Sequence, residues 1–196
     1  MKVGRPAWRE DIKRVEMVRR AIGDEIALLT DANLQWSVSE ALQAGKAMGE
    51  YSVYWLEEPT HPDDVQGHRV IADGIEVPLA LGESLRGKEE FQSYLEARAV
   101  NFPEPDLINV GGITEWMKVA ALAQAHNRPI TSHGYDEIHV HLLAAAPSPS
   151  FVEYHLFRLD DYLCESLPLV NGCLQAPDTP GHGVRFDFEK LGPLQL

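Results

Sequence analysis

Three carboxylates recur at a constant spacing, each at the end of a short apolar run. The runs read IALLTD, VYWLE and VPLALGE, and they end at Asp31, Glu57 and Glu83, so that each acid lies 26 positions after the one before. An acid at the end of a buried strand is unfavourable unless a cation or hydrogen bonds compensate its charge. Carboxylate oxygens are the ligands that hard divalent cations prefer. The spacing therefore predicts a cation site at one end of a parallel sheet.

A second acid, Glu58, directly follows Glu57, and Pro59 stops the run. Successive side chains of a strand point to opposite faces, so Trp55 and Glu57 share one face while Leu56 and Glu58 share the other. Alternation alone leaves open which member of the Glu57–Glu58 pair faces the cation.

Apolar runs and amphipathic segments alternate along the chain with a period near 26 residues. Such βα repeats are typical of a parallel sheet covered by helices, either a closed barrel or an open sheet. Polar residues end six successive runs, and in a barrel these ends meet at one mouth, so we favour an α/β fold of the barrel type. No G-x-G-x-x-G follows a strand, which weakens a dinucleotide-binding interpretation. We expect helices over 7–22, 37–48, 62–73, 88–97, 114–126 and 137–145, strands at 26–31, 53–57, 77–83, 106–110, 129–133 and 151–154, and a C-terminal loop or tail over 167–196.

Composition narrows the class of protein. The 196 residues suffice for one domain, and the formal net charge of −13 disfavours nucleic acid and anionic membranes as partners. We expect no membrane-spanning segment, because no apolar run is long enough, and no signal peptide, because no basic n-region followed by an apolar h-region opens the chain. Cys164 and Cys173 are too few for a disulfide framework. We expect a cytoplasmic protein that forms homo-oligomers.

The ordered set of strand-end residues resembles the C-terminal barrel of the enolase superfamily, specifically its mandelate racemase and muconate lactonizing enzyme group, which includes acid-sugar dehydratases. The matching residues are Lys2, Asp31, Glu57, Glu83, Asp106, His133 (in TSHG) and Glu153. The resemblance covers essentially the whole chain. It implies a (β/α)8-type barrel truncated at the N-terminus, with strands two to eight, and it implies that the N-terminal capping domain and the first barrel strand are missing.

The resemblance also implies roles for these residues. Mg²⁺ would be held by Asp31, Glu57 and Glu83, and would stabilise the enediolate formed when the proton α to a carboxylate leaves. His133, oriented by Asp106, would be an acid or base on one face of the substrate, with Lys2 as the base on the other. Glu153 would contact the substrate carboxylate, and Asn33 a substrate hydroxyl.

Three functions remain open at this point. The first is a lyase that dehydrates a sugar acid to a 2-keto-3-deoxy acid, and the second is a racemase or epimerase of an α-hydroxy acid that uses the same residues. The third is an incomplete barrel that is inactive alone and self-associates or needs a partner chain, because open strand edges invite pairing. His139 and His141 form an H-x-H, but positions i and i+2 of a helix do not face the same way, so we discount a zinc site there.

Overall fold

The computed structural model describes residues 1–154 and 159–192, and strands alternate with helices along most of this length. The strands and helices of the alternating region are α1 (Trp8–Ile22), β1 (Leu28–Asp31), α2 (Val38–Gly49), β2 (Val53–Glu57), α3 (Val65–Gly74), β3 (Leu79–Leu81), α4 (Gly87–Glu96), β4 (Phe102–Pro103), α5 (Ile113–Ala125) and α6 (Asp136–Ala145). The C-terminal segment contains the 3-10 helix η1 (Asp160–Tyr162), β5 (Leu169–Val170), β6 (Cys173–Leu174) and α7 (Phe188–Leu191).

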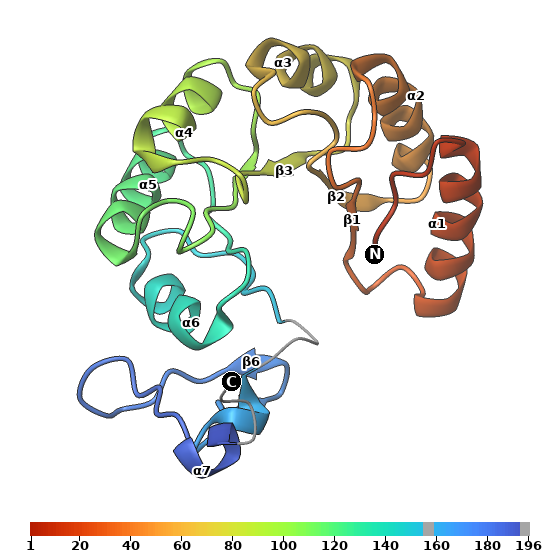
Figure 1. Cartoon of the computed structure of the whole chain (residues 1–196). Helices are drawn as coiled ribbons and strands as arrows, with labels where there is room; N and C mark the ends of the chain where they lie inside the picture. Colours follow the sequence, from red (N-terminus) through yellow and green to blue (C-terminus); the bar gives the residue numbers. More distant parts are fainter. Residues whose placement is uncertain (155–158, 193–196) are drawn as a thin grey trace.

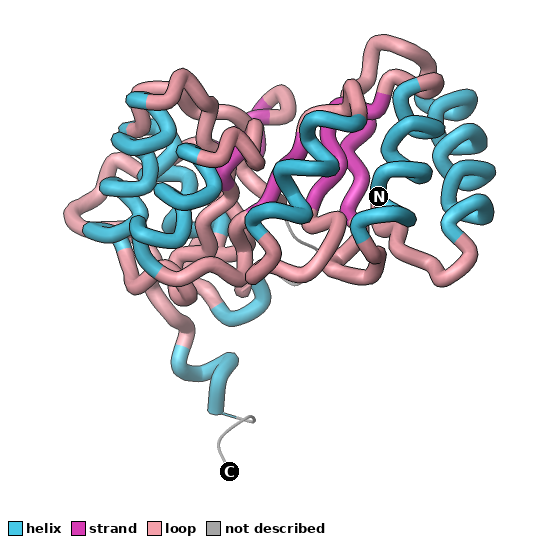
Figure 2. Tube along the Cα trace, turned by 90° about the horizontal axis from the view of Figure 1, so that it is seen from above, coloured by secondary structure: helices cyan, strands magenta, loops and turns pink. Residues whose placement is uncertain are grey.

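The sheet is parallel, and its strands pair in chain order, β1-β2-β3-β4. Single parallel bridges extend it at both ends, from Lys2 to Asp31 and from Asp106 to His133, and a further bridge joins Ile130 to Pro149. Figure 1 shows the result as an arc with the strands inside and helices α1 to α6 outside. Figure 2 shows the strands running side by side with helices along them. This is the α/β barrel arrangement that the repeat predicts, with the ends of the arc near residues 1–3 and 149–154.

Local sequence signals explain where helices begin and how they attach. Ser37 and Glu40 form a capping box at the start of α2, because the Ser37 side chain accepts from the Glu40 N–H and the Glu40 carboxylate accepts from the Ser37 N–H. On α1, the buried Arg19 donates to the carbonyls of Tyr51, Ser52, Gly23 and Ile26 at 2.7–3.0 Å. Arg19 thereby ties α1 to the turns that precede β1 and β2.

Two clusters of buried apolar side chains lie between the strands and the helices. One joins α1, α2 and α3 to β1, β2 and β3, with Met48, Leu56 and Ile71 fully buried. The other joins α4, α5 and α6, with Phe91 and Trp116 at its centre. The core therefore fixes the strands from their helix-facing side, and their C-terminal ends stay available for chemistry.

The strand expected at 106–110 is wrong, because residues 107–111 form a turn and the ladder is made earlier, at Phe102–Pro103. The Asp106 carboxylate accepts from the N–H groups of Ile108 and Asn109, each at 2.8 Å, which turns the backbone out of the sheet. The run at 129–133 contributes only the bridges of Ile130 and His133, and 151–154 forms no strand. Within the tail expected from 167, the structure places the β5–β6 hairpin and α7, whereas 193–196 lie outside the described residues.

In the described ranges 1–154 and 159–192, no helix has the length and apolar character that crossing a bilayer requires.

Candidate active site

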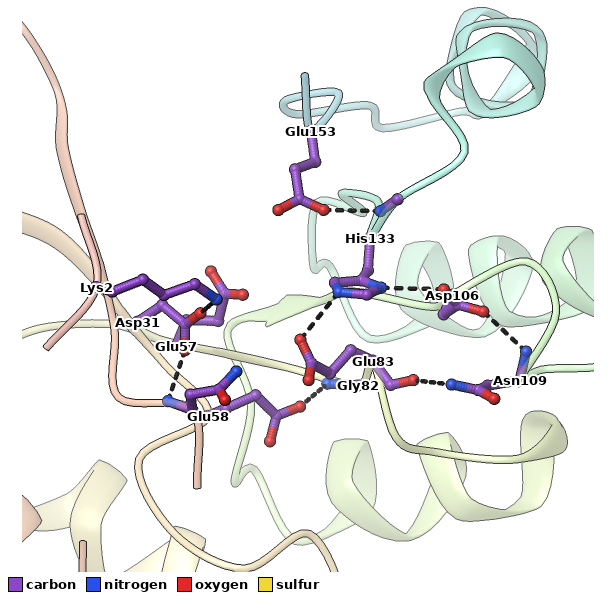
Figure 3. A network of polar contacts seen from close by, with 12 residues as sticks. Lys2, Asp31, Glu57, Glu58, Gly82, Glu83, Asp106, Asn109, His133 and Glu153 are labelled. Carbon is purple, nitrogen blue, oxygen red and sulfur yellow. Dashed lines mark hydrogen bonds and ion pairs between the residues drawn. The ribbon is translucent and has the colours of Figure 1, made fainter. Parts of the chain in front are cut away.

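The C-terminal ends of the strands bring the sequence-predicted residues to one mouth. Asp31 ends β1 and is the register partner of Glu57 at the end of β2. Glu83 follows β3, and the bridge between Asp106 and His133 continues the same edge. Figure 3 shows Lys2, Asp31 and Glu57 on one side of the mouth, His133 and Asp106 on the other, and Glu83 between them. Residues spread over more than 130 positions of sequence thus share one site.

Glu57 faces a cavity of about 340 Å³ that is also lined by Lys2, Asp31 and Glu153. The indole N–H of Trp55 donates to one Glu57 oxygen at 3.2 Å, as expected for two residues on the same face of β2. Burial, and then the negative charges of Asp31, Glu153 and Glu83, raise the pKa of Glu57 to about 8. The acids around Glu57 therefore carry more negative charge than nearby cations neutralise.

Glu58, the second acid of the pair, points away from this cavity and is almost fully buried. One carboxyl oxygen accepts from the Gly82 N–H at 2.8 Å, while the other has no hydrogen-bond partner in the part of the chain that the structure describes. Burial raises the pKa of Glu58 to about 7, although the Gly82 hydrogen bond opposes that shift. Because Gly82 precedes Glu83, the Glu58 contact holds the backbone that presents Glu83.

Lys2 forms an ion pair with Asp31 across the edge of the sheet, and its side chain is largely exposed. Burial of the ammonium would lower the pKa of Lys2, but the hydrogen bond with Asp31 and the charges of Asp31, Glu57 and Glu83 outweigh it and raise the pKa. In this arrangement Lys2 is protonated. To act as a base it must separate from Asp31 and lose its proton.

His133 connects two carboxylates. Its Nδ1 lies 3.0 Å from Asp106 Oδ2 and its Nε2 lies 3.1 Å from Glu83 Oε2. Burial alone would lower the pKa of His133, but the contacts with Asp106 and Glu83 outweigh it and raise the pKa to about 10. The contact with His133 lowers the pKa of Glu83. His133 is therefore an imidazolium at neutral pH in this arrangement, ready to give up a proton.

Glu153 and Asn33 occupy the rim of the same mouth. Glu153 accepts from the Gly134 N–H at 2.7 Å, and its own N–H donates to Ser132 at 3.1 Å, so it is fixed next to the His133 loop. Asn33 is exposed, has a positive φ of 48°, and its N–H donates to Asp31 at 2.7 Å. Their contacts with a substrate stay predictions.

The donor set at the mouth fits a hard cation in its chemistry. Asp31, Glu57 and Glu83 supply carboxylate oxygens, which suit Mg²⁺, and the raised pKa of Glu57 reflects negative charge that a cation would neutralise. As they stand, Asp31 is paired with Lys2 and Glu83 with His133, and within the described ranges no three Asp, Glu, His or Cys side chains form a ready-made ion site. The three-carboxylate set stays a prediction, and ion binding would require both pairs to open.

The two histidines of the H-x-H motif do not converge. His139 is fully buried and its Nδ1 lies 2.6 Å from the Gly134 carbonyl, whereas His141 Nε2 lies 3.0 Å from the His182 carbonyl. Burial lowers the pKa of His139, which keeps it neutral and able to donate from Nδ1. His139 thus holds the carbonyl of Gly134, the residue whose N–H binds Glu153.

Sequence reasoning missed one acid at the mouth, Glu104. It lies just after β4, lines the same cavity as Glu57, and is 3% exposed. The error in the strand position hid it, because a strand placed at 106–110 leaves Glu104 in a loop. Its position two residues before Asp106, between two prolines, is the signal that could have found it.

The charge state of His133 leads to a testable prediction. In the metal-free protein its ring should stay protonated at neutral pH and lose its proton near pH 10, because two carboxylates stabilise the imidazolium. Asp106→Asn removes one negative partner and should lower that pKa. A ¹⁵N NMR titration of the histidine rings measures both values, with the exposed His126 as an internal reference. A neutral His133 ring at pH 7.5 in the unaltered protein would contradict the prediction.

The sequence is similar to a known protein family and to characterised enzymes. The enolase C-terminal domain-like family profile matches residues 1–191. A 3,6-anhydro-alpha-L-galactonate cycloisomerase of Streptomyces coelicolor is 44% identical over all 196 residues, which cover 54% of that protein.

Two solved structures superpose closely. A racemase from Streptomyces coelicolor with bound magnesium gives a TM-score of 0.95 at 43% identity, covering 99% of this chain and 54% of that one. An L-talarate dehydratase from a Polaromonas species, complexed with Mg and L-glucarate, gives 0.92 at 34% identity, covering 97% and 53%. This chain spans about half the length of the proteins it matches.

Proposed function

This chain belongs to the enolase C-terminal domain-like family, and from that premise we propose that it abstracts the proton α to the carboxylate of a sugar acid and eliminates the β-hydroxyl. The product is a 2-keto-3-deoxy acid. The cofactor in this proposal is Mg²⁺, held by Asp31, Glu57 and Glu83, which when bound supplies charge neutralisation at the substrate carboxylate. The similar dehydratase that was solved with Mg and L-glucarate supports this choice of cofactor and substrate class.

The observation that carries the proposal is the placement of an acid and a base at opposite sides of one mouth. Asp106 holds His133 through Nδ1 and stabilises its imidazolium form, so His133 is suited to protonate the departing β-hydroxyl. Lys2 reaches the mouth from the opposite end of the arc, where it meets Asp31. With Asp31 engaged by a cation, the Lys2 ammonium would lose its ion-pair partner and would lie beside a positive charge, which would lower its pKa toward that of a working base.

Glu153 is placed to contact the substrate carboxylate. The Gly134 peptide holds its carboxyl at the rim of the cavity beside the His133 loop, where it can hydrogen-bond to the substrate carboxylate in its protonated form. Trp55 and Phe151 supply apolar lining to the same cavity. The residues of this chain thus bind, orient and move protons at defined atoms.

The decisive experiment incubates the protein with Mg²⁺ and a panel of sugar acids and traps 2-keto acids with semicarbazide. Accumulation of a keto acid supports dehydration. Exchange of the α-proton in D₂O without a keto acid would instead favour the racemase or epimerase alternative, which uses the same residues. Absence of both reactions, together with a solution mass larger than one chain, would favour the incomplete-barrel alternative, in which the chain self-associates or needs a partner.

A further inference from the structure

Glu104 is an acid that the proposed chemistry does not use, yet its backbone is locked into the sheet. Its N–H donates to the Leu81 carbonyl at 2.9 Å, and the carbonyl of the preceding Pro103 accepts from the Thr131 N–H at 3.1 Å. The residue therefore sits between β3 and the segment that carries His133. Its side chain has little freedom to reach another part of the molecule, since the residue is 3% exposed.

The Glu104 carboxyl lacks the partners that a buried acid normally has. Its Oε2 is buried and makes no hydrogen bond in the part of the chain that the structure describes. The nearby Thr131 hydroxyl is already engaged, because it donates to the Phe151 carbonyl at 2.8 Å. Burial, followed by the charges of Glu57, Glu153 and Glu58, raises the pKa of Glu104 well above its ordinary value. An unpartnered buried carboxyl is strongly unfavourable, so its retention points to a ligand.

The direction of the side chain locates that ligand. Glu104 lines the cavity of about 340 Å³ that Lys2, Asp31, Glu57 and Glu153 also line. Its carboxyl therefore faces the part of the proposed active site that Lys2, Asp31 and Glu57 line, whereas Glu83 and His133 lie outside this cavity. The larger cavity of about 820 Å³ lies among residues 163–185 and Glu137, away from the strand ends, and offers no comparable unpartnered acid.

The charge around Glu104 selects the kind of group it can bind. Glu57, Glu153 and Glu58 surround it with negative charge, which disfavours an anionic group, and its unpartnered Oε2 can accept a hydrogen bond. Lys2, a cation on the same cavity, is paired with Asp31 in this structure. A hydroxyl group is uncharged and both donates and accepts, so it can supply the hydrogen bond that the Glu104 carboxyl lacks.

We propose that Glu104 binds a hydroxyl group of the substrate in this cavity and thereby favours polyhydroxy acids over acids with a single hydroxyl. This inference rests on the proposed function, because it takes the ligand of the mouth to be a sugar acid. Glu104 makes no covalent or proton-transfer step in it. Its contribution is a contact that an acid such as mandelate, with one hydroxyl beside its carboxylate, does not make.

Binding of two acids to Glu104→Leu tests the inference. With Mg²⁺ present, calorimetry should show about tenfold weaker binding of L-glucarate, because one buried hydrogen bond is lost, and unchanged binding of mandelate. Equal L-glucarate affinity in both proteins, or an equal loss for both acids, would overturn the inference and leave Glu104 a structural residue. If the unaltered protein binds neither acid, the proposed function fails instead, which keeps the two failures separate.

A second measurement tests the same inference if Glu104→Leu does not fold. In the unaltered protein, the infrared band of the Glu104 carboxyl can be assigned by its disappearance in Glu104→Gln, whose amide keeps the shape of the side chain. Adding L-glucarate should shift this band, because the carboxyl gains a hydrogen bond, and adding mandelate should not. A band that ignores L-glucarate, or that moves equally with both acids, would overturn the inference.

Discussion

Glu57→Gln should remove magnesium binding and turnover while leaving the fold intact. Glu57 stands between Asp31 and Glu83 at the mouth, so it is the member of the proposed ligand set next to both others. Replacing a residue that only orients a metal ligand lowers metal affinity by about 10- to 100-fold. Replacing a ligand itself should therefore lower Mg²⁺ affinity by more than about 100-fold. Calorimetry with Mg²⁺ alone measures this effect without any assay of activity.

Glu57→Gln should also raise the free energy of unfolding of the metal-free protein, although it removes function. The pKa of Glu57 rises from 4.5 to about 8 on folding, so between these pH values the folded state holds a proton that the unfolded state has released. The free energy of unfolding therefore falls as pH rises through this window, and glutamine, which cannot ionise, escapes that loss. Chemical unfolding in EDTA at pH 6 and pH 8.5 should show a larger benefit of Glu57→Gln at the higher pH.

Glu96→Gln is the matched control. Glu96 is exposed on α4 and accepts from Gln92 at 2.6 Å, far from the mouth, so its replacement should change neither magnesium affinity nor the pH dependence of unfolding. Magnesium binding by Glu57→Gln as strong as that of the unaltered protein would exclude Glu57 from the ligand set. The Asp31, Glu57 and Glu83 assignment would then have to be abandoned.

Repetition made the fold predictable, and with it the convergence of most candidate site residues at one mouth. Each βα unit places its polar residue at the same structural point, so a constant spacing in sequence becomes proximity in space, as Asp31 and Glu57 show by their register. Local signals were equally clear at Ser37, where the capping box needs only residues three apart. The alternation of side chains along β2 could not show whether Glu57 or Glu58 faces the cation. The structure decides this, because one face of β2 packs on the helix core and the other face, with Glu57, lines the cavity.

The pairing of side chains at the mouth could not be predicted from the sequence. Asp31 with Lys2, and Glu83 with His133, pair because buried carboxylates take whichever cation the fold brings near, and that depends on tertiary distances. The strand at 106–110 failed for a related reason. Its apolar pattern suggested a strand, but the Asp106 side chain binds the backbone N–H groups of Ile108 and Asn109 and competes with the ladder.

His133→Asn should separate the two proton transfers of the proposed reaction. The asparagine amide can keep a hydrogen bond to Asp106 but cannot give up a proton, so formation of keto acid should fall by about 10²- to 10⁴-fold. If Lys2 is the base on the opposite side of the mouth, the α-proton should still exchange with D₂O. NMR of the recovered acid and semicarbazide trapping measure the two processes in one sample.

The effects of His133→Asn on α-proton exchange and on keto-acid formation distinguish a dehydratase from a racemase, because His133 transfers a different proton in each. In a dehydratase His133 protonates the departing hydroxyl, so His133→Asn should still exchange the α-proton with D₂O but should no longer eliminate the hydroxyl. In a racemase His133 serves the α-proton of one enantiomer, so exchange of that enantiomer stops and the other still exchanges through Lys2. His126→Asn, an exposed histidine beyond the end of α5, should leave both processes unchanged. Elimination at the normal rate by His133→Asn would mean that the proton comes from another group, and the charged His133–Asp106 pair would then have only a structural role.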